Sequence, residues 1–389
     1  MKFNLKIDKM NRMKILISLT TINSYFGIIP YWIEKFKLLK KFDNQTDFFF
    51  NNKIYKKKFK REIIDKLPSV NSKFKFIFYS ISKNFQAIFK VIKYKNKYDL
   101  VYSPSSVLDL IIMPFFLKKY NRKIIWTTIF DNIVPITDPG NKIIRFIAWI
   151  SFKISLILIK KADLIFTISE DLKEYLINHG FDKKKIIITG NGIEIDLIKK
   201  SKKDPKYSFD SLFIGRINET KGIFDMLAVL KEVKKTYPKF KLAIMGNGDI
   251  PTKNKFLNKI KKLKLQKNIK FLGYVSGIKK FNVIKSSKCF WFLSVSKSES
   301  FGIALMEAVS CGLYGFVYDL PVFRKIYKNN EVIFSPINNT KFVSNQILKL
   351  FQSKKFNNQN GKKLLGKYSW KNIVSLENKA IKNIYIKLK

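Results

Sequence analysis

Two segments in the second half of the chain combine glycine with charged side chains at short spacing. In the first, Gly215-Arg-Ile-Asn-Glu-Thr-Lys-Gly222, Gly215 permits a sharp turn after an apolar run, and Arg216 and Lys221 place two cations beside that turn. Paired cations suit the two phosphates of a diphosphate. In a lysine-rich chain the same segment could also be a solvated loop, so alone it leaves both interpretations open.

The second segment, Ser298-Glu-Ser-Phe-Gly-Ile-Ala-Leu-Met-Glu307, predicts a tight turn into a helix. Gly302 permits the turn, 303–309 is rich in helix formers, and Gly312 can end the helix as a left-handed cap. The free N–H groups and the positive dipole end make the start of such a helix a site for phosphate.

Two carboxylates flank this expected anion site. Glu299 lies just before the turn, and Glu307 lies about one turn into the helix. Both could accept hydrogen bonds from hydroxyl groups of a sugar and a ribose. Each also has a structural interpretation: Glu299 as an acid stabilised by the helix dipole, and Glu307 as an ordinary acid on the helix surface.

Short apolar runs alternate with helical patterns along the chain, which predicts parallel sheets covered by helices. The expected strands are 13–19, 99–102, 123–128, 163–168, 211–214, 241–245, 269–272, 289–293 and 331–334. Ser169 is placed to cap the helix that follows the fourth run. Because ligands of such sheets bind at the carboxyl ends of the strands, both charged segments stand where a ligand is expected.

The length of 389 residues suits two domains. A polar stretch from Gly190 to Asp210 follows the first series of strands and has the composition of a linker. We predict an α/β protein of two Rossmann-like, parallel-sheet domains with a ligand cleft between them. The predicted divisions are a first domain over 1–195, a linker over 196–210, a second domain over 211–365, and a C-terminal helix over 366–389 that packs back toward the first domain.

Together these motifs resemble the family 4 glycosyltransferases, the glycogen-synthase-like retaining group with the GT-B fold. The second domain of that family carries a Gly-Arg and Lys-Gly loop after a strand and a later Glu-x7-Glu motif, which stand here at 215–222 and 299–307. Gly246 and Gly248 match its Gly-x-Gly turn, and 272–275 matches its Leu-Gly-x-Val segment. Weaker matches lie at 162–169, 191–192 and 368–370.

The resemblance implies an enzyme that moves a hexose-type sugar, with retention, from a nucleotide-sugar donor to a lipid-linked saccharide or surface-polysaccharide acceptor. It implies that Glu299 orients the donor sugar and that Glu307 holds the ribose. The nucleotide sugar is a substrate, so no cofactor is expected. The donor-binding residues that we predict are Gly27, Gly215, Gly246, Gly248, Phe301, Gly302, Ile303 and Glu307.

The predicted catalytic residues are Arg216, Lys221, Glu299 and Asp131. The two cations would stabilise charge on the leaving diphosphate, and Asp131 stands where the family carries the Asp of a His-Asp pair. Phe130 stands where the His is expected, and the family's early Gly-Gly loop is reduced to Tyr25-Phe-Gly27. These departures keep two alternatives open: a sugar-nucleotide epimerase of GT-B fold, and a non-catalytic sugar-nucleotide or membrane-binding module.

Composition limits the classes of partner and the cellular compartment that we expect for this chain. The net charge of +48 suggests an anionic partner, but the excess is spread over both halves, which argues against nucleic acid. The two cysteines form no metal motif and there is no Asp-x-Asp pair, so we expect catalysis without a metal. Charged Arg145 and Lys153 interrupt the longest apolar stretch, 143–159, so we expect a cytoplasmic chain without a transmembrane segment.

Basic and aromatic residues interleave between Tyr31 and Lys58. We predict that this segment docks on an anionic surface, the inner face of the cytoplasmic membrane, where a lipid-linked acceptor would be held. The alternative is that the aromatic side chains pack against the first sheet while the lysines are solvated.

Overall fold

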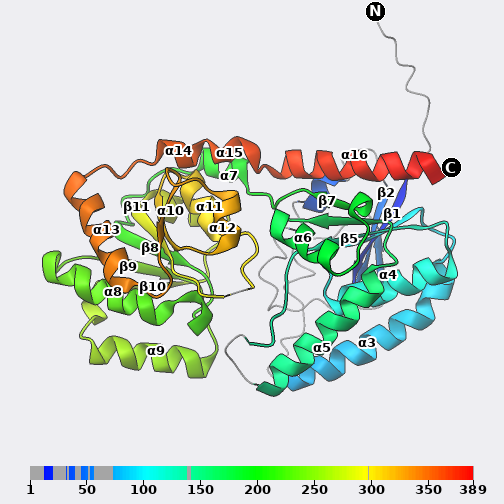
Figure 1. The fold of residues 1–389 in the computed structure, drawn as a ribbon, viewed down its shortest axis with the longest axis horizontal. Helices are drawn as coiled ribbons and strands as arrows, with labels where there is room; N and C mark the ends of the chain where they lie inside the picture. Colours follow the sequence, from blue (N-terminus) through cyan, green and yellow to red (C-terminus); the bar gives the residue numbers. More distant parts are fainter. Residues whose placement is uncertain are drawn as a thin grey trace, which may run out of the picture. The chain divides into compact units, whose positions relative to one another are not determined.

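The computed structural model describes residues 13–20, 32, 35–39, 45–50, 53–56, 73–137, 142–296 and 298–388. The chain packs as two compact units, each built around one sheet (Figure 1). Unit 1 comprises Met1–Val134, Phe146–Thr189 and Ile373–Lys389, and unit 2 comprises Pro135–Arg145 and Gly190–Asn372.

The sheet of unit 1 has seven strands in the order β3-β2-β1-β4-β5-β6-β7. They are β1 (Lys14–Leu19), β2 (Gln45–Phe50), β3 (Lys53–Lys56), β4 (Leu100–Ser103), β5 (Ile125–Phe130), β6 (Leu164–Thr167) and β7 (Ile186–Ile188). The pairs are parallel except β2 with β3. β4, β5 and β6 are buried at every position, as expected for parallel strands covered on both faces.

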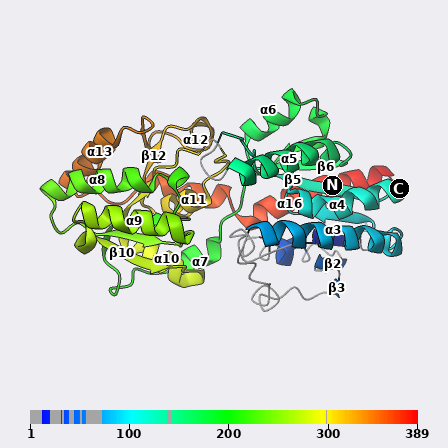
Figure 2. The same ribbon diagram turned by 90° about the horizontal axis from the view of Figure 1, so that it is seen from below.

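The helices of unit 1 follow the strands in alternation. They are α3 (Lys73–Tyr94), α4 (Leu108–Tyr120), α5 (Lys142–Ile159), α6 (Glu170–Asn178), the 3-10 turn η1 (Lys183–Lys185) and, from Ile373 on, α16 (Trp370–Leu388). Ser169 caps α6 by accepting a hydrogen bond from the N–H of Leu172, as predicted. Helices α5, α4 and α3 lie in a row on one side of the unit (Figure 2).

Unit 2 holds a six-stranded sheet in the order β10-β9-β8-β11-β12-β13, with every pair parallel. Its strands are β8 (Phe209–Ile214), β9 (Leu242–Met245), β10 (Ile269–Gly273), β11 (Ser287–Phe292), β12 (Tyr314–Tyr318) and β13 (Val332–Ser335). Phe240, Trp291 and Phe351 stack beside this sheet as part of its aromatic core. The predicted α/β class, with two Rossmann-like parallel-sheet halves, is confirmed.

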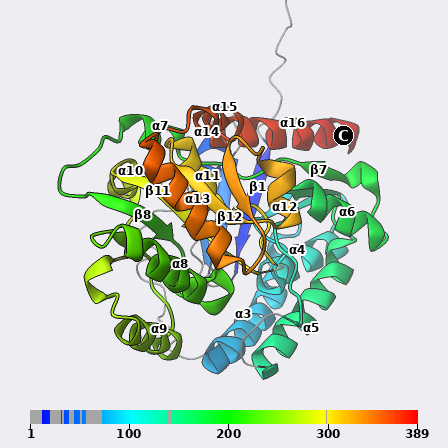
Figure 3. The same ribbon diagram turned by 60° about the vertical axis from the view of Figure 1, so that its left-hand side comes forward.

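Helices cover both faces of the sheet of unit 2, and α8 packs along α13 (Figure 3). They are α7 (Ile195–Lys200), η2 (Glu219–Lys221), α8 (Ile223–Thr236), α9 (Ile250–Lys262), η3 (Gln266–Asn268), α10 (Gly277–Lys285), α11 (Ile303–Ser310), α12 (Pro321–Ile326), α13 (Thr340–Ser353), α14 (Gln359–Lys362) and α15 (Leu364–Lys367). Helix α7 lies in the stretch expected to be a linker, and the ammonium of Lys285 binds its C-terminal carbonyls at Ile198 and Ser201. In the described part of the chain, no helix has the length and apolarity needed to cross a membrane.

The structure corrects the predicted role of the segment from Tyr31 to Lys58. Its aromatic residues Phe36 and Phe48–Phe50 are buried in the core of unit 1, and Phe36 packs edge to face against Phe48 and Tyr102. Lys35 is also buried. These aromatic side chains therefore cannot insert into a membrane, and the packing alternative is correct for them, whereas Lys35 is not solvated as that alternative expected. Lys40, Lys41, Phe42, Lys57 and Lys58 lie outside the described residues.

Candidate active site

The loops after β8 and β9 meet through three glycines that sequence analysis singled out. Gly215 donates its backbone N–H to the carbonyl of Met245 at 3.0 Å. Gly246 adopts φ +142°, and a Cβ there would stand 2.0 Å from the carbonyl oxygen of Gly215; a Cβ on Gly248 would stand 2.3 Å from that of Ile217. Gly246 and Gly248 are thus required because the two loops pack backbone to backbone.

A second close approach brings the loop after β8 to the end of β11. Gly222 has φ +69°, and a Cβ at this position would lie 1.8 Å from the carbonyl oxygen of Leu293. The carbonyl of Thr220 accepts hydrogen bonds from the N–H of Val295 at 2.9 Å and from Ser294 Oγ at 3.0 Å. The chain before Gly222 is therefore fixed against the loop that carries Glu299.

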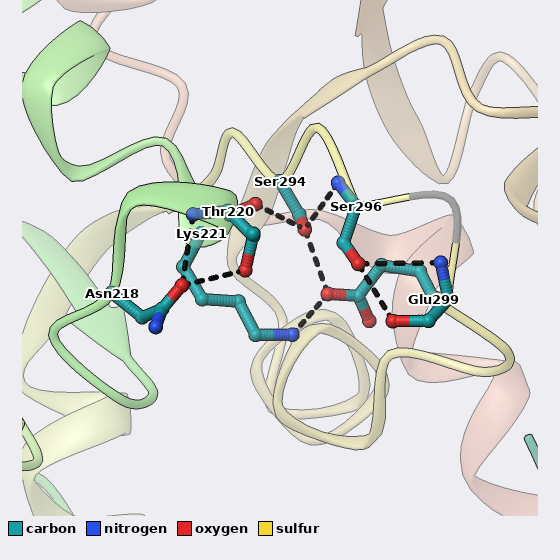
Figure 4. A network of polar contacts seen from close by, with 7 residues as sticks. Asn218, Thr220, Lys221, Ser294, Ser296 and Glu299 are labelled. Carbon is teal, nitrogen blue, oxygen red and sulfur yellow. Dashed lines mark hydrogen bonds and ion pairs between the residues drawn. The ribbon is translucent and has the colours of Figure 1, made fainter. Parts of the chain in front are cut away.

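Lys221 and Glu299 form an ion pair at this junction (Figure 4). Their side chains are 20% and 8% exposed, so the pair is only partly screened by water. Ser294 Oγ donates to the same carboxylate oxygen at 2.7 Å, and Lys221 Nζ lies 5.8 Å from the ring centroid of Phe292. The first predicted acid and the second predicted cation are thus brought together, 78 residues apart in sequence.

The other predicted anion-binding groups of unit 2 lie on the same two loops. Arg216 is exposed, and none of the acidic residues in the described part of the chain forms an ion pair with it. Gly302 adopts φ +69° and ψ 56° at the N-cap of α11, directly before Ile303. Phe301 is buried and packs edge to face on Tyr368, so its side chain fixes the turn. The first N–H groups of α11 remain at the helix start, where they can bind an anion.

Glu307 is not a surface acid. It is 1% exposed, and its Oε1 lies 2.6 Å from Nζ of Lys280 on α10. The same ammonium lies 3.7 Å from the carboxylate of Glu194, just before α7. The adjacent ammonium compensates for part of the hydration that the buried carboxylate loses. Sequence reasoning found neither Lys280 nor Glu194 as its partner, because lysines are everywhere in this chain.

In unit 1, Asp131 directly follows β5 and accepts a hydrogen bond from Ser105 Oγ at 2.8 Å. Burial raises the pKa of this carboxyl to about 6, although the Ser105 hydrogen bond and nearby Lys35 act in the opposite direction. Phe130, which stands in place of the family's His, is fully buried and stacks on Tyr175. The histidine position is therefore part of the core in this chain.

A buried polar cluster lies in unit 1 that sequence reasoning missed. Lys35 Nζ lies 2.6 Å from Glu377 Oε1, and Tyr102 donates to Glu377 Oε2 at 2.9 Å. All three side chains are almost fully buried, and burial lowers the pKa of Lys35 while Glu377 opposes that shift. Glu377 belongs to α16, so the C-terminal helix is joined to unit 1 by an ion pair between residues 342 apart.

The predicted site residues of unit 2 lie on the loops after β8, β9 and β11, except Ile303 and Glu307, which belong to α11. Asp131 lies in unit 1, and Gly27 lies outside the described residues. Among the described residues no group of His, Cys, Asp and Glu has the arrangement of a metal site. Burial raises the pKa of the Cys289 and Cys311 thiols to about 12, so both are inert packing residues.

Two protein-family models match adjacent parts of this chain. The model of glycosyltransferase family 4 matches residues 48–197, and the model of glycosyl transferases group 1 matches residues 194–364. The first match lies mostly on residues of unit 1 and the second mostly on residues of unit 2.

Two curated relatives that are named as glycosyltransferases match this chain over part of their length. An uncharacterised glycosyltransferase of Methanocaldococcus jannaschii is 31% identical over 248 residues, which cover 60% of this chain and 59% of that protein. The phosphatidyl-myo-inositol mannosyltransferase of Mycobacterium tuberculosis is 29% identical over 146 residues, 36% of this chain and 37% of the relative. The matches thus span about three fifths of the first relative and little more than a third of the second.

Solved structures share the architecture at low identity. Anabaena HepE in complex with UDP-glucose aligns with a TM-score of 0.71 at 13% identity, covering 96% of this chain and 100% of the other. The sucrose-phosphate synthase of Thermosynechococcus elongatus aligns with a TM-score of 0.73 at 14% identity, covering 97% and 100%. At these identities the likeness shows the GT-B fold.

Proposed function

We propose that this protein is a metal-independent, retaining glycosyltransferase that moves a hexose-type sugar from a nucleotide-sugar donor to a lipid-linked saccharide or surface-polysaccharide acceptor. The observation that carries the proposal is the ion pair of Lys221 and Glu299 between the loops after β8 and β11, with Arg216 exposed on the first of these loops. Cations and a carboxylate held together on rigid loops suit a substrate that has a diphosphate next to a sugar.

Departure of the nucleoside diphosphate leaves negative charge on its terminal phosphate. Lys221, Arg216 and the start of α11 after Gly302 would stabilise this charge. Groups that are held in place before the reaction do so effectively, because they need not reorient as the charge develops. Glu299 would accept hydrogen bonds from hydroxyls of the donor sugar while Ser294 keeps its carboxylate in place. In this account donor binding loosens the contact between Lys221 and Glu299, and each turns to its own part of the donor.

The names of similar proteins support the class of substrate. HepE has been solved with UDP and with UDP-glucose, and one curated relative is named for transfer of mannose to phosphatidyl-myo-inositol. We extend a nucleotide-sugar donor and a lipid-linked acceptor to this chain as part of the proposal. Asp131 is our candidate for contact with an acceptor hydroxyl, since a carboxyl with a pKa of about 6 is mostly ionised at neutral pH and can accept its hydrogen bond.

The experiment is a thermal-shift panel of UDP-, GDP- and ADP-sugars on the full chain and on Glu299→Gln. At least one donor should raise the melting temperature of the wild-type protein, and the shift should be smaller in Glu299→Gln because the sugar loses a hydrogen-bond acceptor. Glu232→Gln on α8 is the matched control, since Glu232 is exposed and pairs with Lys235 on the same helix. A wild-type protein that responds to no donor would contradict the proposal.

A further inference from the structure

Helix α3 presents four large apolar side chains to solvent. The exposed residues follow the spacing i, i+3, i+7 and i+11, so they form one stripe along the helix. This stripe, 62–74% exposed, consists of Phe78, Ile81, Phe85 and Phe89. Phe85 and Phe89 pack edge to face on each other with ring centroids 4.9 Å apart, which keeps both rings on that side.

The opposite face of α3 is buried but small and partly polar, consisting of Ser80, Asn84, Ala87 and Val91. Ser80 donates a hydrogen bond to Asp109 on α4, and Asn84 donates to the same carboxylate at 3.2 Å. These polar contacts hold the inner side of the helix, while Phe78, Phe85 and Phe89 are exposed on its outer side. This is the reverse of the usual orientation of an amphipathic helix on a globular core.

Helix α5 repeats the arrangement. Its buried residues Phe152, Ser155, Leu156 and Ile159 share one face. A second apolar stripe runs along the opposite face with the same periodicity and is 37–68% exposed. It consists of Phe146, Ile150, Ile154 and Ile157. Helices α3 and α5 cover the same side of unit 1, with α4 between them in the view of Figure 2. Since each stripe lies opposite the buried face of its helix, we infer that both stripes face outward on that side.

The charged residues of these two helices are all positive. Helix α3 contains five lysines, α5 contains two lysines and one arginine, and neither helix contains Asp or Glu. Lys90 and Lys93 are exposed beside the stripe of α3, and Lys153 lies with its Nζ 5.7 Å from the ring centroid of Trp149 on α5. Large exposed apolar patches mark interaction sites, and the chemistry here calls for a partner that is apolar inside and anionic at its surface.

We propose that the α3–α5 face, defined by the two stripes, docks on an anionic lipid bilayer. Phenylalanine and isoleucine side chains would enter the interfacial layer, while the lysines would contact acidic headgroups, each contributing roughly 1 kcal/mol near an anionic leaflet. A second copy of the chain is a poorer occupant, because a two-fold interface would bring the exposed Lys90 and Lys93 of one copy close to the same lysines of the other. The proposal does not depend on which donor the protein uses.

The test is co-sedimentation of the full chain with vesicles of phosphatidylglycerol and of phosphatidylcholine. Phe85→Ser/Phe89→Ser and Ile154→Ser/Ile157→Ser should each lower the apparent affinity for phosphatidylglycerol vesicles at least tenfold. Neither should change the melting temperature, since the side chains are exposed. The control Ile250→Ser/Tyr274→Ser removes equally exposed apolar residues, 75% and 68%, from unit 2 and should bind as the wild type does.

Three results would overturn the proposal. One is equal recovery of the wild-type protein in the supernatant with both lipids. Another is loss of binding in the unit 2 control equal to that in the α3 and α5 variants, which would show that exposed apolar residues outside the α3–α5 face contribute as much to binding. The third is a lipid-free sedimentation-velocity experiment in which the wild-type protein is a dimer and the α3 variant is a monomer. That result would mean that the face binds a second copy of the chain. Because these assays measure binding only, a failed donor panel leaves their outcome unaffected.

Discussion

The buried contacts of Lys280 predict an asymmetric response to mutation in unit 2. Its ammonium lies 2.6 Å from Glu307 and 3.7 Å from Glu194, whose side chains are 1% and 19% exposed. Glu307→Gln removes one of the two carboxylates that face the ammonium of Lys280. Lys280→Met instead removes the ammonium that both carboxylates face. Removal of the cation should therefore destabilise the unit more than removal of the acid.

The expected loss of stability in each variant follows from the burial of the side chains involved. Removing one partner of a buried ion pair costs about 3–5 kcal/mol, which we expect for Lys280→Met. Glu307→Gln keeps a group that can form a hydrogen bond, and the lysine keeps Glu194, so we expect about 1–3 kcal/mol. With a urea m-value of roughly 1–3 kcal/mol per molar, the midpoints of the two variants should differ by on the order of 1 M.

The assay is urea unfolding at pH 7, followed by circular dichroism. The matched control is the exposed pair of Lys235 and Glu232, also 2.6 Å apart, with side chains 66% and 43% exposed. Lys235→Met should change the free energy of unfolding by at most about 1 kcal/mol because exposed pairs contribute little. If Glu307→Gln destabilises the protein as much as Lys280→Met does, the claim that the ammonium of Lys280 stabilises both carboxylates is refuted.

Three further predictions concern the proposed chemistry. Arg216→Ala and Lys221→Ala should each cost about 2–4 kcal/mol of transition-state stabilisation, measured as the transfer rate at subsaturating donor; wild-type rates in both would rule out the diphosphate assignment. Burial raises the pKa of Asp131 from 3.8 to about 6, so the folded state holds this proton more tightly. The free energy of unfolding should therefore fall by up to about 3 kcal/mol as the pH rises from about 4 to about 6, and Asp131→Asn should remove that decrease in urea titrations; the same slope in both proteins would contradict it. Transfer should persist in EDTA, because cationic side chains replace a metal; a loss that manganese restores would contradict the assignment.

The strands that sequence analysis located are those with a continuous apolar run. All nine expected runs form strands within a few residues of the predicted ends, because burial on both faces requires apolar residues at successive positions. β2 was missed because it contains the polar Thr46 and Asp47, both buried. β12 was missed because Gly315 interrupts its run; a Cβ there would lie 2.5 Å from Leu305 of α11, so close packing of that helix requires glycine.

Glycines and charged motifs predicted where a site would lie, but not how its side chains would pair. The left-handed Gly312 after α11 is confirmed at φ +92°, since that cap depends on local sequence alone. The partner of Glu307 depends on how α10 packs against α11, and that of Lys35 depends on the return of α16 to unit 1. Such pairs arise from tertiary packing, and in a chain of net charge +48 no single lysine is distinctive in the sequence.

The most direct measurement of the central claim is transfer of labelled sugar from the donor that gives the largest thermal shift into a lipid-linked saccharide, with release of nucleoside diphosphate recorded in parallel. The wild-type protein should form labelled product and release one diphosphate per sugar transferred. Glu299→Gln should lose at least about a hundredfold in rate while remaining folded, because an interaction made with the reacting sugar is removed. Wild-type transfer by Glu299→Gln, or release of an epimerised sugar nucleotide without transfer, would contradict the account.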